Sequence, residues 1–141
     1  MATRKASATW EGGLRGGKGS FAGESGMGGA YSFGSRFENS GGSNPEELLA
    51  AANAACYSMA LSGALERNGT PPTRVETRAT CTLEKTGDAF SITSMKLHVS
   101  ATVPNVDEAT FRKLAEDMKE GCIVSRALKG NVKYELNATL A

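Results

Sequence analysis

The chain has 141 residues, a formal net charge of +1 and 40% hydrophobic residues. This length predicts a single domain over residues 1–141 with a sizeable hydrophobic core. Acidic and basic residues are interspersed along the sequence, which argues against a nucleic-acid partner and against binding to an anionic membrane surface. The composition therefore favours a small molecule or another protein as the partner.

The N-terminal region, residues 3–35, is predicted to form short β-strands. Apolar and polar residues partly alternate in residues 6–10 and again in residues 30–33. Most of the glycines lie between Gly12 and Gly42, where they are typical of tight turns between strands.

A long helix is predicted to follow this region. Asn44 is a suitable N-cap, Pro45 suits the first helical position, and Glu47 could bond back to the backbone of the cap. Asn68 and Gly69 then provide a stop signal. Residues 48–65 carry no charge and are nearly long enough to cross a bilayer. Their high alanine content and their polar residues favour instead a central helix packed closely within protein.

The remaining elements are predicted from their periodicity. Two long strands are joined by a turn at Gly87 and Asp88, with a bulge between Ile92 and Met95. A helix over residues 107–120, a short helix starting near Cys122 and an alternating strand over residues 132–140 follow. The order is β, α, β hairpin, two helices and β, which predicts an α+β fold.

Three cysteines are the candidates for chemistry. Their odd number fits a reducing compartment, and no apolar leader is visible in residues 1–10, so we expect a cytoplasmic protein. A thiol with a pKa of about 8.5 is mostly protonated at neutral pH, so a reactive Cys56 would need a nearby cation. The start of a helix is expected to favour the thiolate of Cys122. Cys81 lies on the apolar face of its strand and is expected to be structural.

Histidine and metal chemistry find little support in the sequence. The single histidine, His98, is predicted on the polar face of its strand, so no dyad or triad can be built around it. The cysteines show no CxxC spacing, which gives no zinc signature, and we expect no metal.

Three blocks of the sequence resemble the signature blocks of the OsmC/Ohr family. They are Arg36-Phe37-Glu38, then residues 44–62 around Cys56, and then residues 122–128 around Cys122. The N-terminal Gly17-Lys18-Gly19 and Ser25-Gly26, together with Tyr31-Ser32-Phe33, resemble the OsmC branch in particular. The resemblance covers essentially the whole chain, with the blocks in the family's order.

The resemblance implies an organic-hydroperoxide reductase that works through two cysteines. It implies that Cys56 is the peroxidatic thiol, that Cys122 is the resolving thiol, and that Arg36 and Glu46 activate Cys56. It also implies an intertwined α+β homodimer with active sites at the subunit interface, no metal, no haem and no other cofactor. The reductant implied is a dithiol, such as lipoyl groups, or a small thiol.

The sequence departs from the family pattern at two positions. Asn53 stands where OsmC members usually carry histidine, and Ile123 stands where proline is usual. Neither is among the four residues assigned to chemistry. Two other functions stay open, namely an apolar-ligand-binding dimer with inert thiols and a thiol redox sensor without turnover.

Overall fold

The computed structural model describes all residues from Met1 to Ala141. The chain divides into two compact units, Met1–Leu48 and Leu49–Ala141. The mixed α+β class predicted from the sequence is confirmed, with two three-stranded sheets and one long helix.

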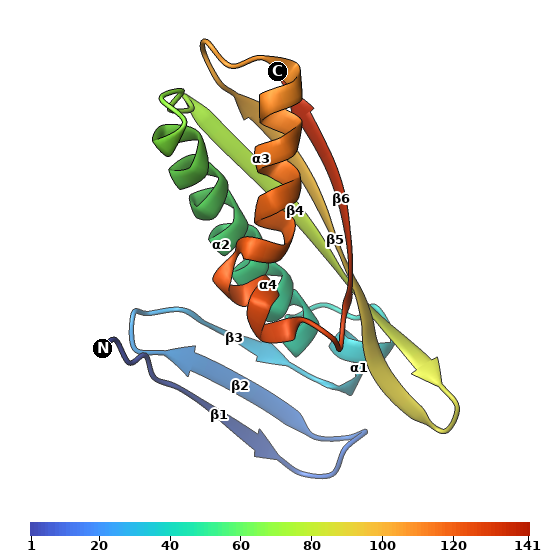
Figure 1. Cartoon of the computed structure of the whole chain (residues 1–141). Coiled ribbons are helices and arrows are strands. Elements are labelled where there is room, and N and C mark those ends of the chain that lie inside the picture. The colour runs from blue at the N-terminus through green and yellow to red at the C-terminus, as the bar shows by residue number, and fades with distance from the viewer. The chain divides into compact units, whose positions relative to one another are not determined.

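The N-terminal unit is built on a small antiparallel sheet (Figure 1). Its strands are β1 (Ala6–Glu11), β2 (Lys18–Gly23) and β3 (Gly28–Tyr31), in that order. The ring of Tyr31 packs against Trp10 and Phe21, with centroids 5.4 Å and 6.1 Å away. A Cβ atom at Gly19 would lie 2.6 Å from the Tyr31 ring, so this position must be glycine for the aromatic cluster to form.

The predicted β region ends earlier than the sequence pattern indicates. Phe33 begins a short helix, α1 (Phe33–Phe37), and does not continue the strand. Ser32 Oγ accepts a hydrogen bond from Ser35 N at 3.0 Å, and Ser35 Oγ accepts one from Ser32 N at 2.8 Å. This reciprocal capping starts the helix, and it outweighs the alternation of residues 30–33, which was too short to be a reliable strand signal.

The C-terminal unit contains a sheet of β4 (Arg74–Thr86), β5 (Ala89–Thr102) and β6 (Lys133–Leu140), with β5 in the centre. The β4–β5 hairpin turns at Gly87 and Asp88 as predicted, and Gly87 has a φ of 67°. The predicted bulge is also present, since Thr82 pairs with Ser94 but Leu83 pairs with Ile92. Strand β6 runs parallel to β5, and two helices connect them.

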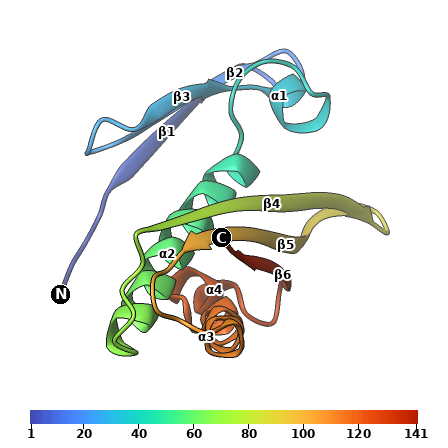
Figure 2. The same cartoon turned by 90° about the horizontal axis from the view of Figure 1, so that it is seen from above.

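Helices cover one face of this sheet (Figure 2). They are α2 (Pro45–Arg67), α3 (Glu108–Gly121) and the short α4 (Ile123–Leu128). The core forms where the buried alternate residues of β5 meet one face of α2 and the apolar stripe of α3. The largest contributors are Tyr57, Leu61, Leu65, Met95, Leu97 and Phe111.

The ends of α2 are defined by local hydrogen bonds. Asn44 Oδ1 accepts from Glu47 N at 2.8 Å, which confirms the predicted N-cap. The Glu47 carboxylate was expected to bond back to the backbone of the cap. It instead accepts a hydrogen bond from the hydroxyl of Ser43. At the other end, Gly69 N and Thr70 N donate to the carbonyls of Glu66 and Leu65, with Gly69 at a φ of 82°.

One side of α2 is not covered by the chain itself. Ala51, Ala52, Ala55 and Met59 are exposed, and Met59 retains 80% of its accessible surface. By length and composition alone, α2 is apolar enough to cross a membrane. The close packing expected for this helix is therefore present on only one of its faces.

Candidate active site

Two thiols from distant parts of the sequence meet in the C-terminal unit. Cys56 is half-buried on α2, and Cys122 is the N-cap residue of α4 and only 1% exposed. The two side chains are hydrogen-bonded to each other, and no disulfide joins them. The structure thus brings together the two cysteines that the sequence analysis singled out.

The Cys122 thiol is subject to two opposing influences on its pKa. Burial raises the pKa of the Cys122 thiol, and the hydrogen bond with Cys56 raises it further. The backbone N–H groups of Val124 and Ser125 and the Ser125 hydroxyl lower the pKa, as expected at a helix start, but they do not outweigh burial. The helix start thus favours the Cys122 thiolate as expected, but burial has the larger effect, and periodicity could not show how completely this side chain is enclosed.

A polar cluster of two buried residues and one half-buried residue adjoins Cys122. Asn53 Nδ2 donates to Ser125 Oγ at 3.2 Å and lies 3.9 Å from Cys122 Sγ. The hydroxyl of Tyr134 donates to Asn53 Oδ1 at 2.5 Å. None of these three polar residues has a role predicted from the sequence. Two spacings could have indicated the cluster, since Asn53 precedes Cys56 by three residues and Ser125 follows Cys122 by three.

Arg36 and Glu46 form a bidentate ion pair in the N-terminal unit. Arg36 Nη2 lies 2.8 Å from Glu46 Oε1, and Arg36 Nε lies 3.1 Å and 3.3 Å from the two carboxylate oxygens. Arg36 belongs to the last turn of α1 and Glu46 to the first turn of α2. The carboxylate is buried while the guanidinium is partly exposed, so Glu46 fixes the plane of a cation that can still meet another group.

An apolar cavity of about 200 Å³ lies next to Arg36 in the same unit. The Arg36 guanidinium is 5.4 Å from the ring centroid of Phe37, and Arg15 lies 4.6 Å above the ring of Phe33. The cavity therefore combines aromatic walls with a positively charged side. Its lining residues are Trp10, Leu14, Tyr31, Ser32, Phe33, Arg36 and Phe37.

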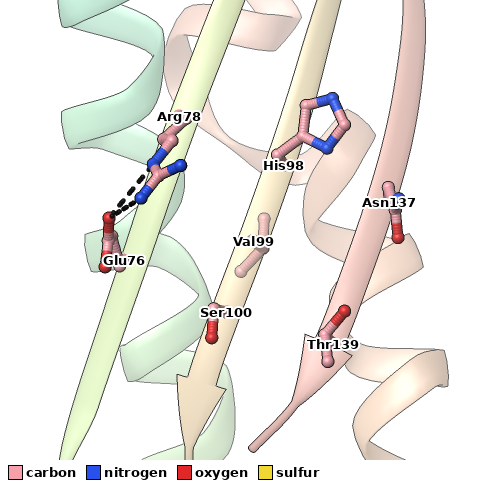
Figure 3. A pocket seen from close by; sticks show the side chains of 7 residues that line it. All are labelled: Glu76, Arg78, His98, Val99, Ser100, Asn137 and Thr139. Carbon is pink, nitrogen blue, oxygen red and sulfur yellow. Dashed lines mark hydrogen bonds and ion pairs between the residues drawn. The ribbon is translucent and has the colours of Figure 1, made fainter.

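The other candidate residues lie elsewhere. Cys81 is half-buried on β4, packed against the core as predicted. His98 is exposed on the outer face of the sheet, in a shallow hollow of about 290 Å³ (Figure 3). There Glu76 pairs with both Arg74 and Arg78, at 3.1 Å and 3.2 Å. No group of three or more His, Cys, Asp or Glu side chains gathers in a way that could hold a metal ion.

The chain is similar in sequence to proteins of one family. The OsmC-like protein family matches residues 37–137. Peroxiredoxin OsmC of Escherichia coli is 43% identical over 134 residues, which cover 94% of each chain. Organic hydroperoxide resistance protein-like 1 of Staphylococcus saprophyticus is 32% identical over 70% of each chain.

The fold is also that of solved relatives. The crystal structure of organic hydroperoxide resistance protein OsmC from Legionella pneumophila superimposes with a TM-score of 0.75 at 22% identity, over 99% of this chain and all of that one. The family match spans more than half of the sequence and includes both Cys56 and Cys122. The chain that brings these two thiols together therefore belongs to the OsmC family.

Proposed function

We propose that this protein is a thiol-dependent peroxidase that reduces organic hydroperoxides to alcohols. The single observation that carries the proposal is the direct contact between the thiols of Cys56 and Cys122 in a member of the OsmC family. The similar proteins named as a peroxiredoxin and as an organic hydroperoxide resistance protein support the same chemistry.

The reaction balances with these two thiols and an external dithiol. The Cys56 thiolate attacks the O–O bond of the hydroperoxide, which gives a Cys56 sulfenic acid and releases an alkoxide that becomes the alcohol on protonation. Cys122 sulfur then bonds to Cys56 sulfur, and the sulfenic hydroxyl leaves as water with the Cys122 proton. A dithiol, such as a lipoyl group, reduces the resulting disulfide back to two thiols.

The environments of the thiols support this division of roles. The raised pKa of the Cys122 thiol, caused by burial, keeps its proton in place while Cys56 is the less buried of the two. Cys56 can therefore meet a peroxide first, and Cys122 waits in contact with it. Because Cys122 is almost fully enclosed, external peroxide reaches it less easily than it reaches Cys56.

Arg36 and Glu46 supply the activating charge in this proposal. The guanidinium would stabilise the Cys56 thiolate, and the bidentate contact with Glu46 holds its plane in one orientation. The neighbouring aromatic cavity suits the organic part of a hydroperoxide better than it suits hydrogen peroxide. Organic hydroperoxides are thus the substrate class that we propose.

Arg36 variants should change the reactivity of Cys56. We expect Arg36→Met, which removes the charge, to slow alkylation of Cys56 at neutral pH by about tenfold, on the scale of one pKa unit. Arg36→Lys keeps the charge but loses the planar fork, so its effect should be smaller. The rate of iodoacetamide alkylation against pH measures both variants. An unchanged midpoint in Arg36→Met would mean that another group activates the thiol.

We further propose that the working form is an intertwined homodimer with active sites shared between subunits. The uncovered face of α2 is rich in alanine, and small residues permit close approach of a second helix across a twofold axis. Glu46 and Cys56 are separated by ten residues of one helix, roughly 15 Å along the axis and about 80° out of phase. A site that uses both residues is therefore best completed by the Arg36–Glu46 pair of the partner subunit.

Mixed dimers test this sharing. Cys56→Ser and Glu46→Ala subunits should each be inactive alone, but a heterodimer should hold one site with an intact Cys56 from one chain and an intact Glu46 from the other. We expect up to half of the wild-type activity per heterodimer. Native mass spectrometry checks that heterodimers form. If they form without any recovery of activity, all the chemistry belongs to one chain.

Turnover separates this proposal from the two alternatives. A noncatalytic apolar-ligand-binding dimer would leave cumene hydroperoxide intact, and a redox sensor would consume one equivalent and stop. We expect repeated consumption of cumene hydroperoxide with dihydrolipoamide as the dithiol, measured as loss of peroxide. Failure to exceed one equivalent of peroxide per Cys56 would contradict the enzyme function.

The single-domain organisation and the cytoplasmic location remain predictions.

A further inference from the structure

The polar cluster of Asn53, Ser125 and Tyr134 lies in an otherwise apolar core. Asn53 is 0% exposed and Ser125 is 2% exposed, whereas the surrounding buried side chains are mainly hydrocarbon. Burial of an amide is costly unless its hydrogen-bonding groups are satisfied. A polar side chain at this depth therefore needs partners, and its geometry is fixed by them.

The contacts of Asn53 hold its amide in one orientation. Tyr134 donates to Oδ1, and burial raises the pKa of the Tyr134 phenol, which keeps that proton in place. Because Oδ1 is occupied, Nδ2 faces Ser125 Oγ and Cys122 Sγ. The Ser125 hydroxyl in turn bonds to Cys122. Two donors are thus aimed at the sulfur of Cys122 from the side of α2 and α4.

Asn53 also shares a face of α2 with Cys56. Residues three apart on a helix are neighbours, so Cys56 lies beside Asn53 on the same rigid element. The contact between Asn53 and Cys122 therefore fixes the position of the N-terminal end of α4 relative to α2, the helix that carries Cys56. A shift of Asn53 would change how the sulfurs of Cys56 and Cys122 approach each other.

We propose that Asn53, held by Tyr134, is the positioning residue that aligns Cys122 for attack on the Cys56 sulfenic acid. This inference rests on the proposed function and concerns only its second step. In that step the Cys122–Cys56 S–S bond forms, the S–O bond of the sulfenic acid breaks, and the Cys122 proton leaves with the hydroxyl as water. The donors on Asn53 and Ser125 stabilise the negative charge that develops on the Cys122 sulfur as its proton departs.

The test measures the two steps separately in a Cys81→Ala background, which leaves only Cys56 and Cys122. Asn53→Asp keeps the acceptor for Tyr134 but replaces the amide donor by a negative charge. Asn53→His restores a ring N–H donor. Ser58→Ala is the matched control, because it removes a different side-chain hydrogen bond on α2, to Thr77 at 2.7 Å.

Reduced protein is mixed with one equivalent of cumene hydroperoxide, and mass spectrometry follows loss of the Cys56 thiol, dimedone-trapped sulfenic acid and the disulfide. We expect Asn53→Asp to slow disulfide formation by about tenfold more than it slows loss of the thiol, because the lost hydrogen bond affects only disulfide formation, whereas the new negative charge beside Cys56 also disfavours the Cys56 thiolate. Asn53→His should recover most of the rate, and Ser58→Ala should match wild type. Equal slowing of both steps, or no difference from Ser58→Ala, would overturn the inference.

A second variant and a second oxidant separate the positioning role from a loss of stability and from failure of the proposed function. If Asn53→Asp melts well below wild type, Tyr134→Phe replaces it, since it frees the amide from its anchor without adding a charge. Disulfide formation is also driven by diamide, a thiol oxidant that needs no peroxide chemistry. If wild type does not consume peroxide but Asn53 variants form the disulfide more slowly with diamide, the proposed function is contradicted and the positioning role is supported. If peroxide works and the variants match wild type in both reactions, only the positioning role fails.

Discussion

The Cys56→Ser variant is expected to lose peroxide turnover by on the order of a thousandfold or more, because the nucleophile is removed and a serine hydroxyl is not ionised at neutral pH. The exchange changes little volume at a half-buried position, so the fold should be kept. The assay is consumption of cumene hydroperoxide with a dithiol, together with the melting temperature. Retention of most of the activity would show that Cys56 is structural.

Cys81→Ser is the matched control for this experiment. Cys81 is also half-buried and packs against the same core, but its strand position gives it no part in the proposed reaction. We expect its turnover to stay close to that of wild type. A comparable loss in both variants would indicate damage to the core and would leave Cys56 without a distinct role.

The Cys122→Ser variant is expected to stop after the first chemical step. Cys56 should still attack one equivalent of peroxide, but no thiol remains in contact with it to form the disulfide. The sulfenic acid should therefore persist, and excess oxidant should convert it to sulfinic acid. Steady-state turnover with a dithiol that requires the internal disulfide should fall to the background rate.

Mass spectrometry distinguishes these products in the two proteins. Wild type treated with one equivalent of organic hydroperoxide should show a disulfide between Cys56 and Cys122, whereas Cys122→Ser should show one added oxygen on Cys56 and two after excess peroxide. A bridge that contains Cys81 would contradict the assignment of Cys122 as the resolving thiol.

Much of the fold follows from local signals. The N-cap at Asn44 and the stop at Gly69 define α2, since both depend on groups within a few residues. The turn at Gly87 and the alternation of β5 likewise follow from short-range chemistry and a period of two. The two cysteine blocks carry the resemblance to the OsmC/Ohr family. Similarity to members of this family extends over most of the chain.

Local signals gave the wrong element where a strand pattern and a helix cap overlap in the sequence. Residues 30–33 alternate like a strand, but the serines at 32 and 35 cap a helix, and only the reciprocal hydrogen bonds of the folded chain decide between them. Helix α1 places Arg36 where it can pair with Glu46. The bidentate geometry of that pair could be expected from the resemblance but not measured from the sequence.

The tertiary structure alone decided the environment of Cys122. Asn53 meets Cys122 and Tyr134 across sequence separations of 69 and 81 residues, contacts that no periodicity of a single element encodes. The pKa of the Cys122 thiol follows from the same packing, because burial raises it more than the nearby N–H groups lower it. A sequence thus identifies which thiols can react, whereas the enclosure and hydrogen bonds that set their reactivity arise only when distant elements pack together.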